Sequence, residues 1–271
     1  MIDALGFKGI WNRAPNVLRK LEELAETTER LMDGHFGGKA SFRRSLAENF
    51  GNMFDLVQAS FLSDTVVYGV AMKQLHEVLT KVSEAVSDFP VPIPAPKERS
   101  PMLDSLVVVS SAVHVSETVL AAVRSEPVLA YRGAISFGEF EIARDGRFLV
   151  GPAVDDAAEH HELAQGAFVW ITPRALNVLG APAPRWPDVL VPYDVPLKGG
   201  AKLATYVVSP FAYCKTETEC AEIESALLGS FSTDALDVAL KRQETARFLT
   251  FARSRWTSEP PKADSTDGGA R

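Results

Sequence analysis

The sequence predicts an α+β fold in which helices pack against a mixed β-sheet, and three observations support this class. Residues 53–71 carry β-branched and aromatic side chains on both sides of Ser63 and Asp64, a pattern typical of a β-hairpin. Residues 128–150 and 189–211 hold further short apolar runs separated by turn residues. Helices are predicted between and after these strands, at residues 11–33, 72–87, 102–124, 153–165 and 216–255. This mixture of strands and helices is typical of the α+β class.

Local signals define several of these elements. In residues 11–33, Val17, Leu21 and Leu24 recur near helical spacing, and glycines at 34, 37 and 38 end the segment. The helix at 153–165 follows Pro152, which suits the first turn of a helix. Residues 167–172 read as one more strand, and a break near Gly229 divides the last helical stretch.

Two proline-rich segments are predicted as loops. Residues 89–101 contain five prolines and residues 180–187 contain three. Along the whole chain we predict a catalytic-type domain at 1–175, a C-terminal extension of strands and helices packed on it at 176–257, and a disordered tail at 258–271. The tail is rich in Pro, Ser, Asp and Gly.

The composition narrows the function classes. The chain has 271 residues and a formal net charge of −7, which argues against non-specific nucleic-acid binding because that requires a basic surface. Two cysteines, Cys214 and Cys220, cannot form a disulfide framework, so a reduced, cytoplasmic protein is expected. The apolar runs are all too short for a membrane span.

Two aspartates are the candidate metal ligands. Asp3 lies just before the first predicted helix, and Asp64 lies at the tip of the predicted hairpin. A strand end and an adjacent hairpin turn can bring two carboxylates together, and oxygen ligands suit Mg²⁺ or Mn²⁺. Gly6 and Phe7 would offer backbone N–H groups to phosphate at a helix start. Since Asp3 is almost the first residue, either translation begins upstream of Met1 or the first strand is very short.

Four segments in order resemble the class III nucleotide cyclases. The Asp-x-x-Gly-Phe of residues 3–7 is similar to the family's first metal motif, and residues 61–67 (Phe-Leu-Ser-Asp-Thr-Val-Val) resemble the hairpin that bears the second. Residues 132–139 and 151–158 resemble a later strand and the helix start that follows it. The resemblance covers roughly residues 1–175 and implies a ferredoxin-like βαββαβ core.

The departures from the usual pattern point to one branch of that family. Asp155 and Glu159 stand where Asn and Arg are usual, and Ser60 stands where a purine-selecting Lys or Glu is common. These departures and residues 193–198 resemble the pyrimidine (uridylate and cytidylate) cyclases of the Pycsar system of bacterial antiphage defence. The resemblance implies that UTP or CTP is converted to cUMP or cCMP, a second messenger for a separate receptor protein.

The same resemblance implies how the site would be composed. Asp3, Ala4 and Asp64 would hold two Mn²⁺ or Mg²⁺ ions. Gly6, Phe7, Lys8, Ser60 and Asp155 would contact the nucleoside triphosphate. The site would lie at the interface of a homodimer, with Arg132 as a further catalytic residue.

Other interpretations of these residues remain open. Asp3 can be an exposed helix N-cap, Asp64 an ordinary turn residue, and Arg132 the partner of a nearby carboxylate. The segment Glu-His-His-Glu at 159–162 lacks the His-x-x-x-His spacing of a metal site and is predicted as a solvated helix face. A cyclase-like regulatory or binding module without turnover, and an unrelated soluble structural protein, are the alternatives to an active enzyme.

Overall fold

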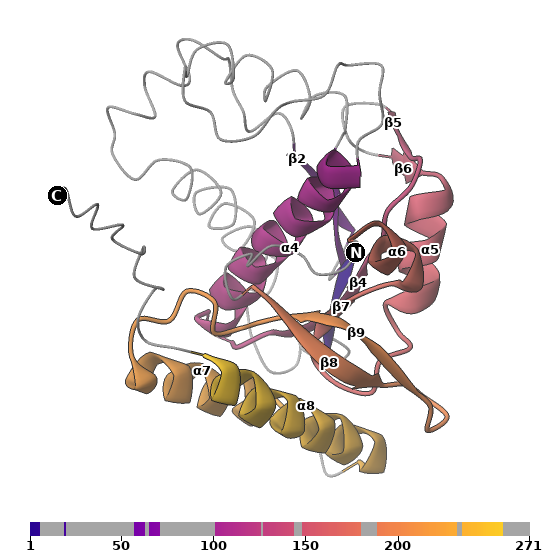
Figure 1. Cartoon of the computed structure of the whole chain (residues 1–271). Coiled ribbons are helices and arrows are strands. Elements are labelled where there is room, and N and C mark those ends of the chain that lie inside the picture. Colours follow the sequence, from indigo (N-terminus) through magenta and orange to yellow (C-terminus); the bar gives the residue numbers. More distant parts are fainter. Residues whose placement is uncertain are drawn as a thin grey trace, which may run out of the picture.

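Seven strands form one mixed sheet in the order β2-β3-β1-β4-β7-β9-β8 (Figure 1). The computed structural model describes residues 1–5, 19, 57–62, 65–70, 101–125, 127–143, 148–179, 189–231 and 235–256. In chain order the strands of this sheet are β1 (Ile2–Leu5), β2 (Val57–Leu62), β3 (Thr65–Val70), β4 (Ala130–Ile135), β7 (Val169–Ile171), β8 (Leu190–Pro196) and β9 (Lys202–Val208). The sheet is packed with helices, so the predicted α+β class is confirmed.

The strand directions follow from the pairing. β4 and β7 run parallel, whereas β1, β2 and β3 are antiparallel to their neighbours, as are β8 and β9. A separate two-stranded sheet pairs β5 (Glu141–Ala143) with β6 (Phe148–Val150). The short β1 is therefore an interior strand that joins the β2–β3 hairpin to the rest of the sheet.

The β2–β3 hairpin is confirmed in its strands and their register. Leu62 pairs with Thr65, and the ladder continues outward to the pair Val57 and Val70. Only residues 63 and 64 separate the two strands, and both lie outside the described residues. β-Branched residues dominate β3, where Val66 and Val67 are buried on opposite faces of the sheet.

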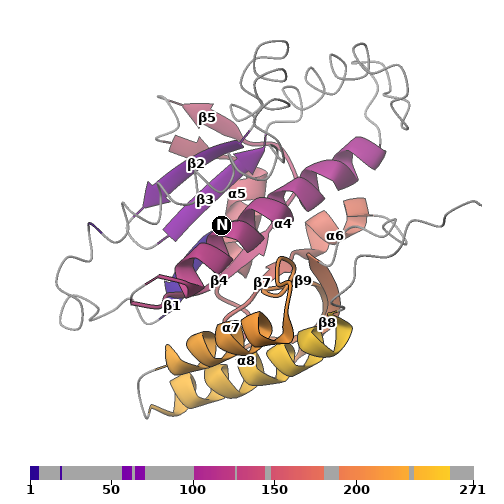
Figure 2. The same ribbon diagram turned by 90° about the vertical axis from the view of Figure 1, so that its left-hand side faces the viewer.

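Helices pack on both faces of the sheet (Figure 2). α4 (Pro101–Val123) and α6 (Pro173–Leu179) share one core cluster with Ile2, Tyr131 and Ile171. α7 (Glu217–Gly229) and α8 (Leu236–Arg255) share a second cluster with Trp170 and Val207. Neighbours in a strand, such as Trp170 and Ile171, point to opposite faces, and the last part of α4 also reaches the second cluster through Leu120 and Val123. α5 (Pro152–His160) packs against β4.

One helix ends earlier than the sequence predicts, and one further helix had no counterpart in the prediction. α5 ends at His160 instead of 165, because the chain turns at 161–163 and Ala164 then bridges to Leu197. α6 was not predicted; it has seven residues, too few to show a helical repeat, and it begins at Pro173. The helix at 102–124 and the break near Gly229 are confirmed by α4, α7 and α8.

Several predicted features lie outside the described residues: the helices at 11–33 and 72–87, the loops at 89–101 and 180–187, and the tail at 258–271. The predicted boundary after residue 175 falls inside α6, and strands from both sides of it join the same sheet. The division into domains stays a prediction. No helix in the described part of the chain has the length and apolarity needed to cross a membrane.

Candidate functional site

The register of β1 defines the surroundings of position 3. On one side Asp3 pairs with Thr65 of β3, and on the other it pairs with Arg132 of β4. Residues directly opposite one another in antiparallel strands belong to the same face of a sheet. Positions 3, 65 and 132 therefore form a row across three strands. Thr65 is also the residue that follows Asp64 in the chain.

β1 pairs with β4 over more residues than it pairs with β3. Pairing with β4 extends through Ala4 and Leu5, whereas the described pairing with β3 includes only Ile2 and Asp3. β1 thus continues past Thr65, the first residue of β3, and the sequence hypothesis requires the two aspartates to meet at this end of β1.

Arg132 is the described cation nearest in register to position 3. Its residue is 9% exposed, and its Nη2 donates a hydrogen bond of 2.9 Å to Oε1 of Glu162. Glu162 comes from the turn after α5, and its side chain is 54% exposed. A buried guanidinium requires an anionic or hydrogen-bonding partner, and Glu162 supplies one. The alternative in which Arg132 pairs with a nearby carboxylate is therefore observed, while its catalytic role stays a prediction.

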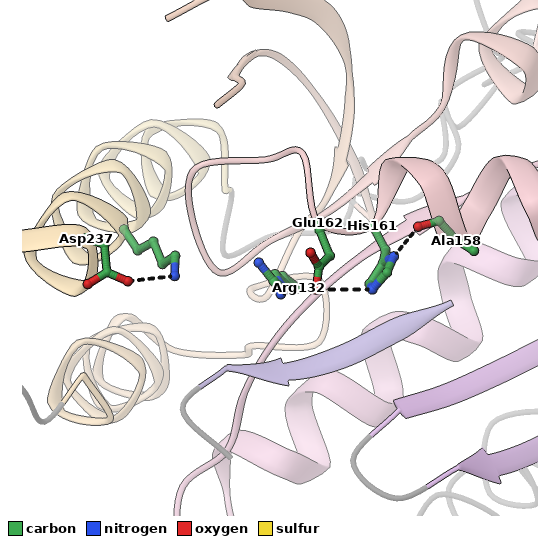
Figure 3. A network of polar contacts seen from close by, with 6 residues as sticks. Arg132, Ala158, His161, Glu162 and Asp237 are labelled. Atoms are coloured by element: carbon green, nitrogen blue, oxygen red, sulfur yellow. Dashed lines mark hydrogen bonds and ion pairs between the residues drawn. The ribbon is translucent and has the colours of Figure 1, made fainter. Parts of the chain in front are cut away.

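One histidine, His161, lies beside that ion pair (Figure 3). Nε2 of His161 lies 3.9 Å from Oε1 of Glu162, and its Nδ1 lies 2.6 Å from the carbonyl oxygen of Ala158. His160 packs edge-on against Trp170, with ring centroids 5.6 Å apart. The predicted solvated face at 159–162 is confirmed for Glu159 and Glu162, which are exposed, and is wrong for His160, which contacts the core; Glu162 lies beyond the end of α5 and also binds Arg132 of β4.

Two adjacent aspartates in the N-terminal half of α5 differ in their exposure to solvent and in their contacts. Asp155, one of the predicted substrate contacts, is exposed, and so is Glu159 one turn later. Asp156 points inward instead: its Oδ2 accepts a 2.5 Å hydrogen bond from Ser136, and its Oδ1 lies 3.5 Å from Nδ1 of His160. Asp156 therefore ties α5 to the end of β4, and Asp155 is the member of the pair that solvent reaches.

Several predicted site residues cannot be placed from the structure. Gly6, Phe7, Lys8 and Asp64 lie outside the described residues. Ser60 lies in β2, where it pairs with Val67 of β3, and it precedes Asp64 by four residues in the sequence. Within the described part of the chain no three His, Cys, Asp or Glu side chains gather into a metal-binding group.

A mostly apolar cavity of about 120 Å³ lies between α4, α5, β3 and β4. Val107, Phe137, Phe140 and Ala157 contribute to its wall, and Met1 lies beside it. The Met1 amine donates a 2.9 Å hydrogen bond to the Ala134 carbonyl, and burial lowers the pKa of this amine to about 5. The cavity is at the Met1 end of β1, away from the Leu5 end where the metal ligands are expected.

α4 also carries ionisable side chains that sequence reasoning missed. Glu117 and His114 are 1% and 4% exposed, and Nδ1 of His114 lies 3.9 Å from Oε2 of Glu117. Burial, and then the negative charge of Glu117, raise the pKa of Tyr213. In the sequence these residues resemble the polar face of an amphipathic helix, so no local signal distinguished them.

Comparison with protein-family models, with curated proteins and with solved structures finds no match to this chain.

Proposed function

We propose that this protein is a nucleotide cyclase that converts a nucleoside triphosphate, UTP or CTP, into a 3′,5′-cyclic nucleotide and pyrophosphate. The observation that carries the proposal is the pairing of Asp3 with Thr65, the residue after Asp64. Asp3 is thereby paired with the residue that directly follows Asp64 in the chain, although about sixty residues separate the two aspartates. This supports the sequence hypothesis that both belong to one metal site.

The strand order gives a second line of support. β2, β3, β1 and β4 are neighbours in that order, and each adjacent pair is antiparallel. This is the arrangement of the ferredoxin-like βαββαβ unit, with α4 connecting β3 to β4. The class III cyclase fold that we propose is built on such a unit.

The residues proposed as ligands fit the chemistry of a hard divalent cation. Because Thr65 shares the face of Asp3, the metal site requires the turn at residues 63–64 to direct the Asp64 carboxylate to that same face. The carboxylates of Asp3 and Asp64 and the carbonyl of Ala4 would then supply oxygen ligands, which suits Mg²⁺ or Mn²⁺. When bound, two such ions supply acidification of the attacking 3′-hydroxyl and charge stabilisation at the triphosphate.

The remaining residues have roles in binding and orientation. Arg132 places a positive charge in the same row as position 3, and Glu162 holds its guanidinium in one orientation. A fixed cation near a phosphoryl group stabilises charge that develops during transfer without having to reorganise. Asp155 is exposed at the start of α5 and is available to a ligand or to a second subunit.

A panel of the four nucleoside triphosphates with Mn²⁺ tests the proposal. Purified protein should release pyrophosphate and a cyclic nucleotide from a pyrimidine triphosphate. Asp3→Asn and Asp64→Asn should abolish product, whereas Asp237→Asn, an exposed substitution of the same chemistry on α8, should retain it. Absence of product from every triphosphate would refute the proposal. The expected homodimer and cytoplasmic location belong to the same proposal.

A cyclase-like module that binds nucleotide without turnover is the second candidate. It is favoured by the acidic, exposed side chains of Asp155 and Glu159 at positions where the family usually has Asn and Arg. In that case titration calorimetry would detect nucleotide binding that Asp64→Ala leaves unchanged, and no pyrophosphate would form.

A further inference from the structure

The apolar cavity at the Met1 end of β1 lies between two strands that continue past β1. Ile2 pairs with Val66 on one side and with Gly133 on the other, and the Met1 carbonyl accepts a 2.9 Å hydrogen bond from the Ala134 N–H. β3 and β4 both extend beyond these pairs, and in the described part of the chain no strand lies between their ends. A space roughly one strand wide is therefore left in the sheet, and α4 and α5 border it.

Close contacts hold the wall of this cavity in place. A Cβ atom at Gly69 of β3 would lie 2.9 Å from the Phe140 ring, so the ring packs directly on the backbone of the glycine. The neighbouring Glu139 carbonyl accepts a 3.1 Å hydrogen bond from the Ala153 N–H at the start of α5. The wall is thus fixed by both β3 and α5, and a pre-formed cavity is the usual setting of a small-molecule site.

The lining of the cavity selects an uncharged ligand. Valine, isoleucine, leucine, phenylalanine and alanine supply most of it, and none of the lining side chains, which all belong to the described part of the chain, is acidic or basic. Burial lowers the pKa of the adjacent Met1 amine to about 5, so this amine is uncharged at neutral pH. An ionised ligand would lose its hydration here without gaining a counter-ion.

Two serine hydroxyls add a polar character to the lining. Oγ of Ser111 donates a 2.9 Å hydrogen bond to the Val107 carbonyl, and Oγ of Ser136 donates one of 2.5 Å to Oδ2 of Asp156. A hydroxyl has one hydrogen to donate and two lone pairs that accept. Because both hydrogens are already used, these two oxygens accept from a ligand and do not donate to it.

We propose that this cavity is a binding site for a small neutral aromatic molecule that carries one hydrogen-bond donor, of the size of phenol. The cavity volume is about 120 Å³, and an apolar cavity of about 150 Å³ accommodates benzene. The ring packs against Phe137 and Phe140, and its hydroxyl donates to a serine oxygen. The site goes beyond the proposed cyclase activity, because it lies at the opposite end of β1 from the expected metal ligands.

Titration of the 271-residue protein with phenol tests the proposal. Phenol should bind with a stoichiometry of one and raise the melting temperature. In NMR spectra its ring protons should give intermolecular NOEs to the methyl groups of Val115 and Ile135, which line the cavity. Benzene lacks the donor and should bind about tenfold more weakly, and the charged benzoate ion should not bind. Absence of these NOEs, or binding of benzoate as tight as that of phenol, would overturn the inference.

Two adjacent alanines of α5 provide a matched pair of variants. Ala157 lines the cavity and is 6% exposed, whereas Ala158 is exposed. Ala157→Leu should fill the cavity and weaken phenol binding by at least about tenfold, while Ala158→Leu should change it by less than about twofold. Equal affinity of the two variants for phenol contradicts the proposal. The NOEs are measured on the wild-type protein, so they test the site even if Ala157→Leu does not fold.

Substitution of the serines tests the hydrogen bond. Either Ser111→Ala or Ser136→Ala should reduce the affinity for phenol to that for benzene, because it removes the accepting oxygen. If both variants keep the preference for phenol over benzene, the proposed donor contact is wrong.

Discussion

Thr245→Val should destabilise the protein because it removes a hydroxyl that connects α8 to the turn after α5. Thr245 is completely buried; its Oγ1 accepts a 2.8 Å hydrogen bond from the Ala167 N–H and donates one of 2.7 Å to the Lys241 carbonyl. Valine has the same shape as threonine and the same stiffness at χ1, so the substitution changes hydrogen bonding and little else.

The cost of this substitution can be estimated from burial. Ala167 is 7% exposed, so its N–H would lose its partner with little access to water. An unsatisfied buried donor costs about 1–3 kcal/mol, and a central value of about 2 kcal/mol corresponds to a melting temperature lower by about 4–8 °C. Thr245→Ser keeps the hydroxyl and loses one buried methyl group, which costs about 1 kcal/mol.

Urea unfolding and amide hydrogen exchange together test whether the hydrogen bond between Thr245 and Ala167 stabilises the protein. The Val variant should be the less stable of the two, and the amide of Ala167 should exchange faster in the Val variant than in the wild-type or the Ser variant. If the Val variant is as stable as the wild type, or if the Ala167 amide keeps its protection, then this hydrogen bond does not stabilise the contact between α8 and the segment before β7.

Three further predictions follow from other contacts. A double-mutant cycle of Glu162→Gln with Arg132→Gln should give a coupling of about 1–2 kcal/mol in unfolding experiments, because the hydrogen bond is charged and one partner is half-exposed; zero coupling would contradict this. Phe248→Ala should cost about 3–5 kcal/mol because this buried ring contacts two other aromatic rings, whereas Leu240→Ala on the exposed side of α8 should change stability by less than about 0.5 kcal/mol. In the reduced protein the unfolding free energy should fall as pH rises from 9 to about 12, because the unfolded chain ionises the Cys214 thiol first; Cys214→Ser should reduce this slope, and an unchanged slope would assign it to other groups.

Local patterns in the sequence were sufficient for most of the described elements. The β-branched residues around positions 63 and 64 predicted both strands of the hairpin, and Gly229 marked the end of α7. These signals are local because hairpin register and helix ends depend on residues that are neighbours in the chain. The α+β class followed from the order of such elements.

The candidate site could be predicted only in part. The sequence predicted Asp3, Asp64 and Arg132 as site residues. In the strand register, Asp3 lies opposite Arg132 on one side and opposite the residue after Asp64 on the other. It also left open that Arg132 pairs with a carboxylate, but it did not identify Glu162. The segment that holds Glu162 has no motif, and only the turn after α5 brings it to β4.

The amino-acid order alone was enough to indicate where strands, helices and turns begin, because each of these depends on side chains within a few residues of one another. The placement of β1 between β3 and β4 and the ion pair of Arg132 depend on the assembled sheet. Contacts between residues distant in sequence depend on which faces of the strands and helices bury apolar surface against one another. A local sequence pattern does not contain that information.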